Sequence, residues 1–258
     1  MNLASLGFLY LFVVISPIVF WIWFFRRLDA TESESGRFLF RIFRFGFVAL
    51  VIAFIVEIII DRTFFSQAIE FMGTYEDVEI DPTVLGLILI SFFLAGPVEE
   101  FIKYYILRRV TFKNPEFNQI ADGIIYGVTL ALGFVLVENT GYFYDLYANA
   151  PEDFLFSVSL FRGTATTLLH IVSTGIIGLY LGRSKFETGG GLKLALKGVL
   201  IASLLHGMFN VFLFFEFGFF MNILLVIIAM IYLVLEIRRG DFQKVWVVAK
   251  KESTKMEE

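Results

Sequence analysis

The sequence predicts an all-α fold, a bundle of about seven helices that spans a membrane. Hydrophobic residues make up 58% of the 258 positions, and only 18% are charged. A soluble domain, by contrast, is about half apolar and about a quarter charged. Apolar runs of about 20 residues, the length that crosses a bilayer core as a helix, recur along most of the chain. There is no cysteine, which excludes disulfides, thiolate metal ligands and cysteine nucleophiles.

Seven segments fit such a membrane-spanning helix. They cover residues 4–25, 38–60, 84–107, 119–141, 156–182, 193–215 and 218–237. The first is too long for a cleavable signal peptide, lacks a basic start and is followed by no small-residue cleavage site. No repeat or low-complexity linker divides the chain. We therefore expect one membrane-embedded domain over residues 1–240 and a short charged cytoplasmic tail over residues 241–258.

Basic residues alternate from one loop to the next. Four regions hold 18 of the 21 lysines and arginines: residues 26–44, 108–118, 183–197 and the tail after residue 237. The intervening loops, residues 61–83 and 142–162, are acidic instead. The positive-inside rule then predicts a multi-pass protein of the cell membrane with its N-terminus outside and its C-terminus in the cytoplasm. Because the basic residues lie in loops and form no patch, a nucleic-acid partner is not expected.

The third segment carries the densest polar group, the stretch GPVEEFIK at residues 96–103. Charged residues at bilayer depth are costly and therefore indicate function. Pro97 suits the first turn of a helix, so the segment is predicted to break at Gly96-Pro97 and restart with two carboxylates at the new N-terminus. Glu99 and Lys103, four residues apart, are predicted to form an ion pair. Since Glu99 and Glu100 are adjacent and point in different directions, one lysine is not expected to neutralise both.

Three later segments carry further polar residues. These are Glu138 and Asn139 near the outer end of the fourth, Arg162 and His170 in the fifth, and His206 and Asn210 in the sixth. Both histidines of the chain lie inside spans, and histidine is the usual general base and the commonest nitrogen ligand. Asn210 shares a helix face with His206, where it could orient the imidazole or donate to an oxyanion. Glu57 and Glu236, which are lone acids near span ends, are interpreted as structural.

Acids and histidines that converge in a dry bundle have three chemical uses. A carboxylate can activate water while a histidine or asparagine stabilises the oxyanion. Two histidines and a glutamate can instead hold zinc and activate its bound water. The groups can also form a proton or ion relay in a transporter. Transporters often contain inverted repeats, and none is visible here, which favours an enzyme.

Four spaced motifs together resemble the PrsW family of intramembrane proteases. They are Glu99-Glu100-x-x-Lys103, Phe134-x-x-x-Glu138-Asn139, Arg162 followed by His170, and His206-x-x-x-Asn210, within residues 84–215. That family is grouped with the CAAX prenyl proteases and bacteriocin-processing proteins. The prenyl-protease branch is less similar, because it carries EExxxR and Tyr104 stands at the position of that arginine.

The resemblance implies cleavage of single-span, membrane-anchored proteins near the outer face, such as the first cut in an anti-sigma factor. The residues implied are Glu99, Glu100, Glu138, His170, His206 and Asn210 as catalytic groups, with Lys103, Asn139 and Arg162 in support. The family is classed with metallopeptidases while its relatives are argued to be glutamate proteases. Zinc held by Glu138, His170 and His206 therefore stays open beside a metal-free site. A proton- or ion-coupled transporter and a non-catalytic scaffold are the alternatives.

The depths of the acids conflict with a shared site if the helices are straight. At 1.5 Å per residue, Glu99 would lie about 22 Å from the outer end of its span and Glu138 only about 5 Å. A break at Gly96-Pro97 would let residues 84–95 run shallow and would raise Glu99 toward the outer leaflet. A continuous helix with Glu99 and His206 more than about 12 Å apart, beyond the reach of a catalytic hydrogen bond, would contradict a shared site.

Overall fold

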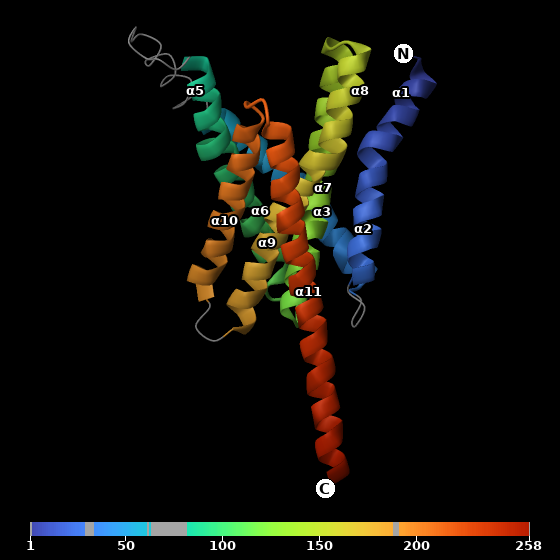
Figure 1. Cartoon of the computed structure of the whole chain (residues 1–258), viewed down its shortest axis with the longest axis vertical. Helices are drawn as coiled ribbons and strands as arrows, with labels where there is room; N and C mark the ends of the chain where they lie inside the picture. The colour runs from blue at the N-terminus through green and yellow to red at the C-terminus, as the bar shows by residue number, and fades with distance from the viewer. Residues whose placement is uncertain (1, 29–33, 61, 63–81, 188–190, 258) are drawn as a thin grey trace.

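The computed structural model describes residues 2–28, 34–60, 62, 82–187 and 191–257 (Figure 1). The regular elements in these ranges are all helical, and six of the helices are long and apolar enough to cross a membrane. A further long helical segment spans residues 82–111 and carries the paired glutamates. The all-α fold is thus confirmed, and the chain is a multi-pass protein of the cell membrane. The two ends of the chain lie on opposite sides of the bundle (Figure 1).

Three of the long helices contain a π-helical stretch, in which the backbone hydrogen bonds reach back five residues instead of four. In chain order the elements are α1 (Leu3–Tyr10), π-helical η1 (Leu11–Ile15), α2 (Ser16–Leu28), α3 (Gly36–Ile60), α5 (Pro82–Leu89), π-helical η3 (Ile90–Ala95), α6 (Gly96–Thr111), α7 (Ile120–Asn149), α8 (Glu152–Phe161), π-helical η4 (Arg162–Thr166), α9 (Thr167–Phe186), α10 (Gly191–Phe212) and α11 (Gly218–Glu257).

Helices α7 and α9 form the centre of the bundle. We compared an 18-residue apolar stretch of each helix. In α7, 78% of these residues are buried, and in the α8–η4–α9 helix 94% are buried, whereas in the α1–α2 helix only 22% are. Gly123 and Gly178 let the two central helices touch, since a Cβ on Gly178 would lie 1.9 Å from the backbone oxygen of Gly123. Small residues allow such close backbone approach in membrane bundles. Among the six candidate spans, the two helices that carry Glu138 and His170 are therefore the most enclosed by protein.

The break predicted at Gly96-Pro97 is wrong, because the helix runs on through this point with a π-helical stretch just before it. The backbone stays helical through η3 and into α6, and Gly96 N–H donates to the oxygen of Ser91, five residues back. Pro97 has no N–H to donate, so the regular α-helical bond at this point cannot form. The segment is accordingly continuous, and the shallow or re-entrant course expected for residues 84–95 is replaced by a local change in helix winding.

The fourth span is longer than predicted, which reduces the conflict in depth between Glu138 and Glu99. Helix α7 continues to Asn149, eight residues beyond the expected end at residue 141. Glu138 therefore lies 11 residues, or about 16 Å, from the end of its helix. Its predicted place near the outer end is wrong because Phe143 is buried against Val13, Val14 and Leu155, which stabilises the extra turns.

Two features that the sequence singled out lie outside the described residues. They are most of the acidic loop 61–83, of which residues 63–81 are not described, and Gly189-Gly190 of the glycine run. The segment expected as a tail continues helix α11 to Glu257. The orientation in the membrane and the division at residue 240 stay predictions.

Candidate active site

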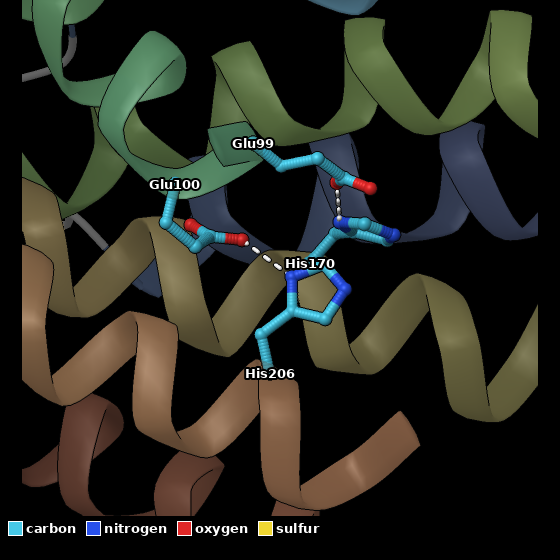
Figure 2. A group of neighbouring side chains, drawn as sticks. All are labelled: Glu99, Glu100, His170 and His206. Atoms are coloured by element: carbon cyan, nitrogen blue, oxygen red, sulfur yellow. Dashed lines mark hydrogen bonds and ion pairs between the residues drawn. The ribbon is translucent and has the colours of Figure 1, made fainter. Parts of the chain in front are cut away.

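Three helices bring the paired glutamates and both histidines to one point inside the bundle. Glu99 and Glu100 come from the first turn of α6, His170 from α9 and His206 from α10. Figure 2 shows each glutamate directed at one imidazole. One ligand atom of each of the four residues lies within 4.8 Å of the others. This convergence satisfies the distance condition for a shared site without a break in the helix.

Glu100 is fully buried and its carboxylate accepts hydrogen bonds from several groups. Oε1 accepts from Lys103 Nζ at 3.0 Å and from Ser173 Oγ at 3.0 Å, and lies 2.9 Å from His206 Nδ1. Thr174 Oγ1 lies 3.5 Å from the other oxygen. Sequence reasoning missed Ser173 and Thr174, although both follow His170 by about one helical turn and so share its face. These contacts hold the Glu100 carboxylate in one orientation.

Lys103 contacts both glutamates, although its single positive charge neutralises only one of them, as the sequence led us to expect. Its Nζ lies 2.9 Å from Glu99 Oε2, 3.0 Å from Glu100 Oε1 and 2.8 Å from His170 Nδ1. The side chain is fully buried, and Nζ also lies 3.9 Å from the centre of the Phe134 ring. The reason is spacing, because residues three and four positions before Lys103 both lie on its side of the helix.

The second ring nitrogen of His170, Nε2, faces Glu138 of the fourth span. His170 Nε2 lies 3.0 Å from Glu138 Oε2, and Glu138 Oε1 accepts from Arg162 at 2.7 Å. The Arg162 guanidinium lies over the ring of Tyr142 at 3.5 Å. Both ring nitrogens of His170 therefore have partners, and the ring orientation is set by Lys103 on one side and Glu138 on the other.

Asn139 connects the fourth span to the π-helical stretch of the fifth. Its amide nitrogen donates to the backbone oxygen of Arg162 at 3.3 Å and to Thr167 Oγ1 at 3.2 Å. Asn210 is half-buried one turn beyond His206, and its side chain makes no hydrogen bond within the described part of the chain. Asn139 thus has a structural contact, whereas the side chain of Asn210 is free to meet another molecule.

Close packing of α10 on the third span brings His206 within reach of Glu100. A Cβ on Gly96 would lie 2.9 Å from the backbone oxygen of Ser203, and a Cβ on Gly207 would lie 3.0 Å from the Phe92 ring. Gly207 directly follows His206, and Phe92 belongs to η3. Larger side chains at these glycines would separate the helices that carry Glu100 and His206.

Glu57, interpreted as structural from the sequence, lies within electrostatic reach of the site. It is half-buried in α3 and interacts with Glu99, Lys103 and Glu138 through space. One of its carboxylate oxygens is buried and has no hydrogen-bond partner among the described residues. Its position three residues before the end of its span obscured this proximity, because acids near span ends are usually interfacial.

The donors suit a metal in their chemistry but not in their present arrangement. Two imidazoles and two carboxylates are the ligand types that zinc uses. The set is Glu99, Glu100, His170 and His206, whereas Glu138, predicted as a ligand, lies behind His170 and pairs with Arg162. Lys103 Nζ occupies the space between three of these donors, so a metal ion does not fit there while the lysine stays in place.

The fold and site together define a class: a multi-pass membrane protein with a closed glutamate–histidine centre inside its helical bundle. Comparison with known proteins gives the family. Residues 34–235 match the family described as "PrsW family intramembrane metalloprotease", a range that contains all four motifs. The chain belongs to this family, which confirms the resemblance inferred from the motifs.

Several curated proteins named "Protease PrsW" are similar to the chain. The one from Clostridioides difficile is 33% identical over 148 residues, which is 57% of this chain and 60% of that protein. The one from Halalkalibacterium halodurans is 36% identical over 126 residues, 49% of this chain and 55% of that protein. The one from Geobacillus kaustophilus is 26% identical over 196 residues, 76% of each. The matches thus span less than two thirds of the first two relatives, and no solved structure matches the chain.

Proposed function

We propose that this chain is an intramembrane protease that hydrolyses a peptide bond of membrane-anchored proteins inside its helical bundle. The observation that carries the proposal is the meeting of Glu99, Glu100, His170 and His206 within 4.8 Å. A transporter relay would place its acids and histidines in a row across the membrane. Here they surround one point, which supports a reaction centre rather than a relay.

The two glutamates have different surroundings and are assigned different roles. The Glu100 side chain is fully buried and its carboxylate is engaged by Lys103, Ser173 and His206. The Glu99 side chain is 12% exposed, and its Oε1 makes no hydrogen bond to a described residue. A general base needs a free oxygen within reach of water. Glu99 is therefore the proposed base, and Glu100 the acid that holds the surrounding groups in place.

In the proposed reaction, Glu99 takes a proton from water as the water oxygen bonds to the carbonyl carbon of the scissile peptide. The charge that develops on the carbonyl oxygen is stabilised by the free amide of Asn210 and by His206 with both ring nitrogens protonated, so that Nδ1–H donates to Glu100 and Nε2–H donates to the carbonyl oxygen. When the carbon–nitrogen bond breaks, the proton held by Glu99 passes to the leaving amine. His170 has both nitrogens engaged and is assigned a positioning role through Lys103 and Glu138.

The proposed substrates are proteins anchored by a single span and cut near the outer face, as in the first cut of an anti-sigma factor. His206 lies six residues, or about 9 Å, from the end of α10 that the charge pattern places outside. A substrate helix would have to unwind there for its backbone to reach Glu99, because hydrogen-bonded helical carbonyls are not open to attack.

Cleavage by the purified full-length chain in vesicles, with a labelled single-span peptide, tests this function. We expect wild-type protein to cut the peptide and Glu99→Gln to lower kcat by about 10²–10⁴-fold, the usual contribution of a general base. Glu236→Gln, which removes an acid far from the centre, is the matched control and should cut normally. Cleavage that persists at the wild-type rate in both Glu99→Gln and His206→Ala would disprove the proposed centre.

A further inference from the structure

We propose that the amino group of Lys103 is the resident cation of the centre and occupies the position a divalent metal would take. Zinc or a similar ion that prefers nitrogen and oxygen ligands then binds only by displacing this side chain. The inference concerns the occupancy of the centre and does not depend on the proposed proteolysis. The inference matters because the family of this chain is described as one of metalloproteases.

The contacts of Nζ account for every bond that a lysine amino group can make. A protonated amine has three N–H donors and one carbon stem. The three acceptors are Glu99 Oε2, Glu100 Oε1 and His170 Nδ1, at 2.9, 3.0 and 2.8 Å. The face of Phe134 lies against the group at 3.9 Å, where a cation is favoured by the ring electrons. The amino group is therefore held as completely as a ligated ion.

The acceptors of Lys103 are also the donors of the candidate metal group. Glu99, Glu100 and His170 belong to both sets, and only His206 does not contact Nζ. A divalent ion among the same three atoms would lie within bonding distance of an ammonium group in a region of low dielectric, where like charges repel strongly. The lysine and the ion are thus alternatives and cannot both be present.

Charge balance supports the same conclusion. Two carboxylates and one ammonium leave one negative charge in the centre, while the nearby Glu138 is already paired with Arg162. Without the lysine, the two carboxylates would match the charge of one divalent ion, and the two imidazoles would complete a four-ligand set. Removal of the Lys103 amino group should therefore convert a weak metal site into a strong one.

Zinc binding by the full-length protein, without substrate, tests the proposal. The probe is zinc alone, measured by titration calorimetry and by metal analysis after dialysis against metal-free buffer. We expect wild-type protein to lose its zinc on dialysis and Lys103→Met to bind one equivalent at least 100-fold more tightly. The double variant Lys103→Met/His206→Ala should lose that gain. Lys185→Met, which removes a lysine bonded to the backbone oxygen of Phe117 away from the centre, should behave as wild type.

Two results would overturn the proposal. One is a wild-type protein that keeps one equivalent of zinc through dialysis, a measurement that needs no variant to fold. The other is a folded Lys103→Met protein, checked by its helical circular dichroism, that binds zinc no more tightly than wild type. Since the assay contains no substrate, either result would leave the proposed proteolysis to be judged by the cleavage experiment alone.

Discussion

Helix α9 carries two groups of polar side chains, one buried around His170 and one partly exposed around Arg183. At His170, side chains from three further helices point to one spot, and the tips of Lys103 and Glu100 have no contact with solvent. Thirteen residues later, about 20 Å along the helix, Arg183 pairs with Glu236 of α11 at 2.9 Å. These two side chains are 24% and 11% exposed, and Glu236 also contacts Arg239. The second group, the Arg183 cluster, links the C-terminal end of α9 to the middle of α11.

The difference shows how a reaction centre is distinguished from an electrostatic link. The Arg183 cluster consists of simple pairs of opposite charge with at least one partly exposed side chain, and such pairs contribute little to stability. The centre places unlike groups together where water is scarce, and breaking any one pair would leave an uncompensated buried charge. From the sequence both groups look alike, because each is an acid in a hydrophobic segment with a basic residue nearby. The two groups can be distinguished by comparing the effects of the same kind of substitution in the centre and in the Arg183 cluster.

The largest contrast is expected between Glu138→Gln and Glu236→Gln. Glu138 holds His170 Nε2 at 3.0 Å, so its loss should let the imidazole and Lys103 shift. A shift of about 1 Å near reacting atoms costs about 10²-fold in rate. We expect kcat for peptide cleavage to fall by about that factor with KM little changed, and Glu236→Gln to retain its kcat. Equal loss in both variants, or loss confined to KM, would contradict a positioning role for Glu138.

A smaller contrast is expected between two serines of α9. Ser173 Oγ donates to Glu100 Oε1 at 3.0 Å, whereas Ser184 Oγ bonds only to the backbone oxygen of Leu181. A hydrogen bond to a charged group contributes about 1.5–3 kcal/mol. Ser173→Ala should therefore lower kcat by about tenfold, and Ser184→Ala should leave it within about twofold. Rescue of kcat by Ser173→Thr, which restores the hydroxyl, is the further check on this assignment.

The smallest effect is expected for Arg183→Met. A partly exposed ion pair contributes about 0–1 kcal/mol, so the unfolding free energy should fall by no more than about 1 kcal/mol. The effect should shrink further in high salt, which screens exposed charges. Thermal unfolding in detergent at two salt concentrations measures it, with cleavage rate as the second readout. A large fall in kcat would show that this cluster is coupled to the centre after all.

Part of the centre follows from sequence because it is local. Glu99, Glu100 and Lys103 lie within one turn of α6, so helical spacing alone predicts their proximity. The family motifs also pointed to residues that lie together, since His170 and His206 belong to the same cluster, while the catalytic roles of these residues stay a prediction. The contact of Lys103 with Glu100 as well as Glu99 follows from the same spacing, because Glu100 lies three residues and Glu99 four residues before the lysine.

Other parts of the centre could not be derived from local patterns. Hydropathy decreases after residue 141 and so predicts too early an end for α7. The helix continues because Phe143 packs against Val13, Val14 and Leu155, residues that are distant from most of α7 in the sequence. Ser173 and Thr174 looked like ordinary small residues of a membrane helix, and their bonds to Glu100 exist only because α9 crosses α6 at that level. Spacing along one helix carries no information about its height relative to another.

The sequence by itself determined which segments cross the membrane, which acids and histidines lie within them and to which family the chain belongs. Those properties depend on hydrophobicity and on the order of residues along the chain, and both can be read directly. Only the tertiary structure decided that the four groups meet, that Glu100 is fully engaged while Glu99 keeps a free oxygen, and that Lys103 lies between the metal-type donors. These outcomes depend on how closely the helices approach at Gly96 and Gly207 and on how deep each helix runs, which are set by packing between helices.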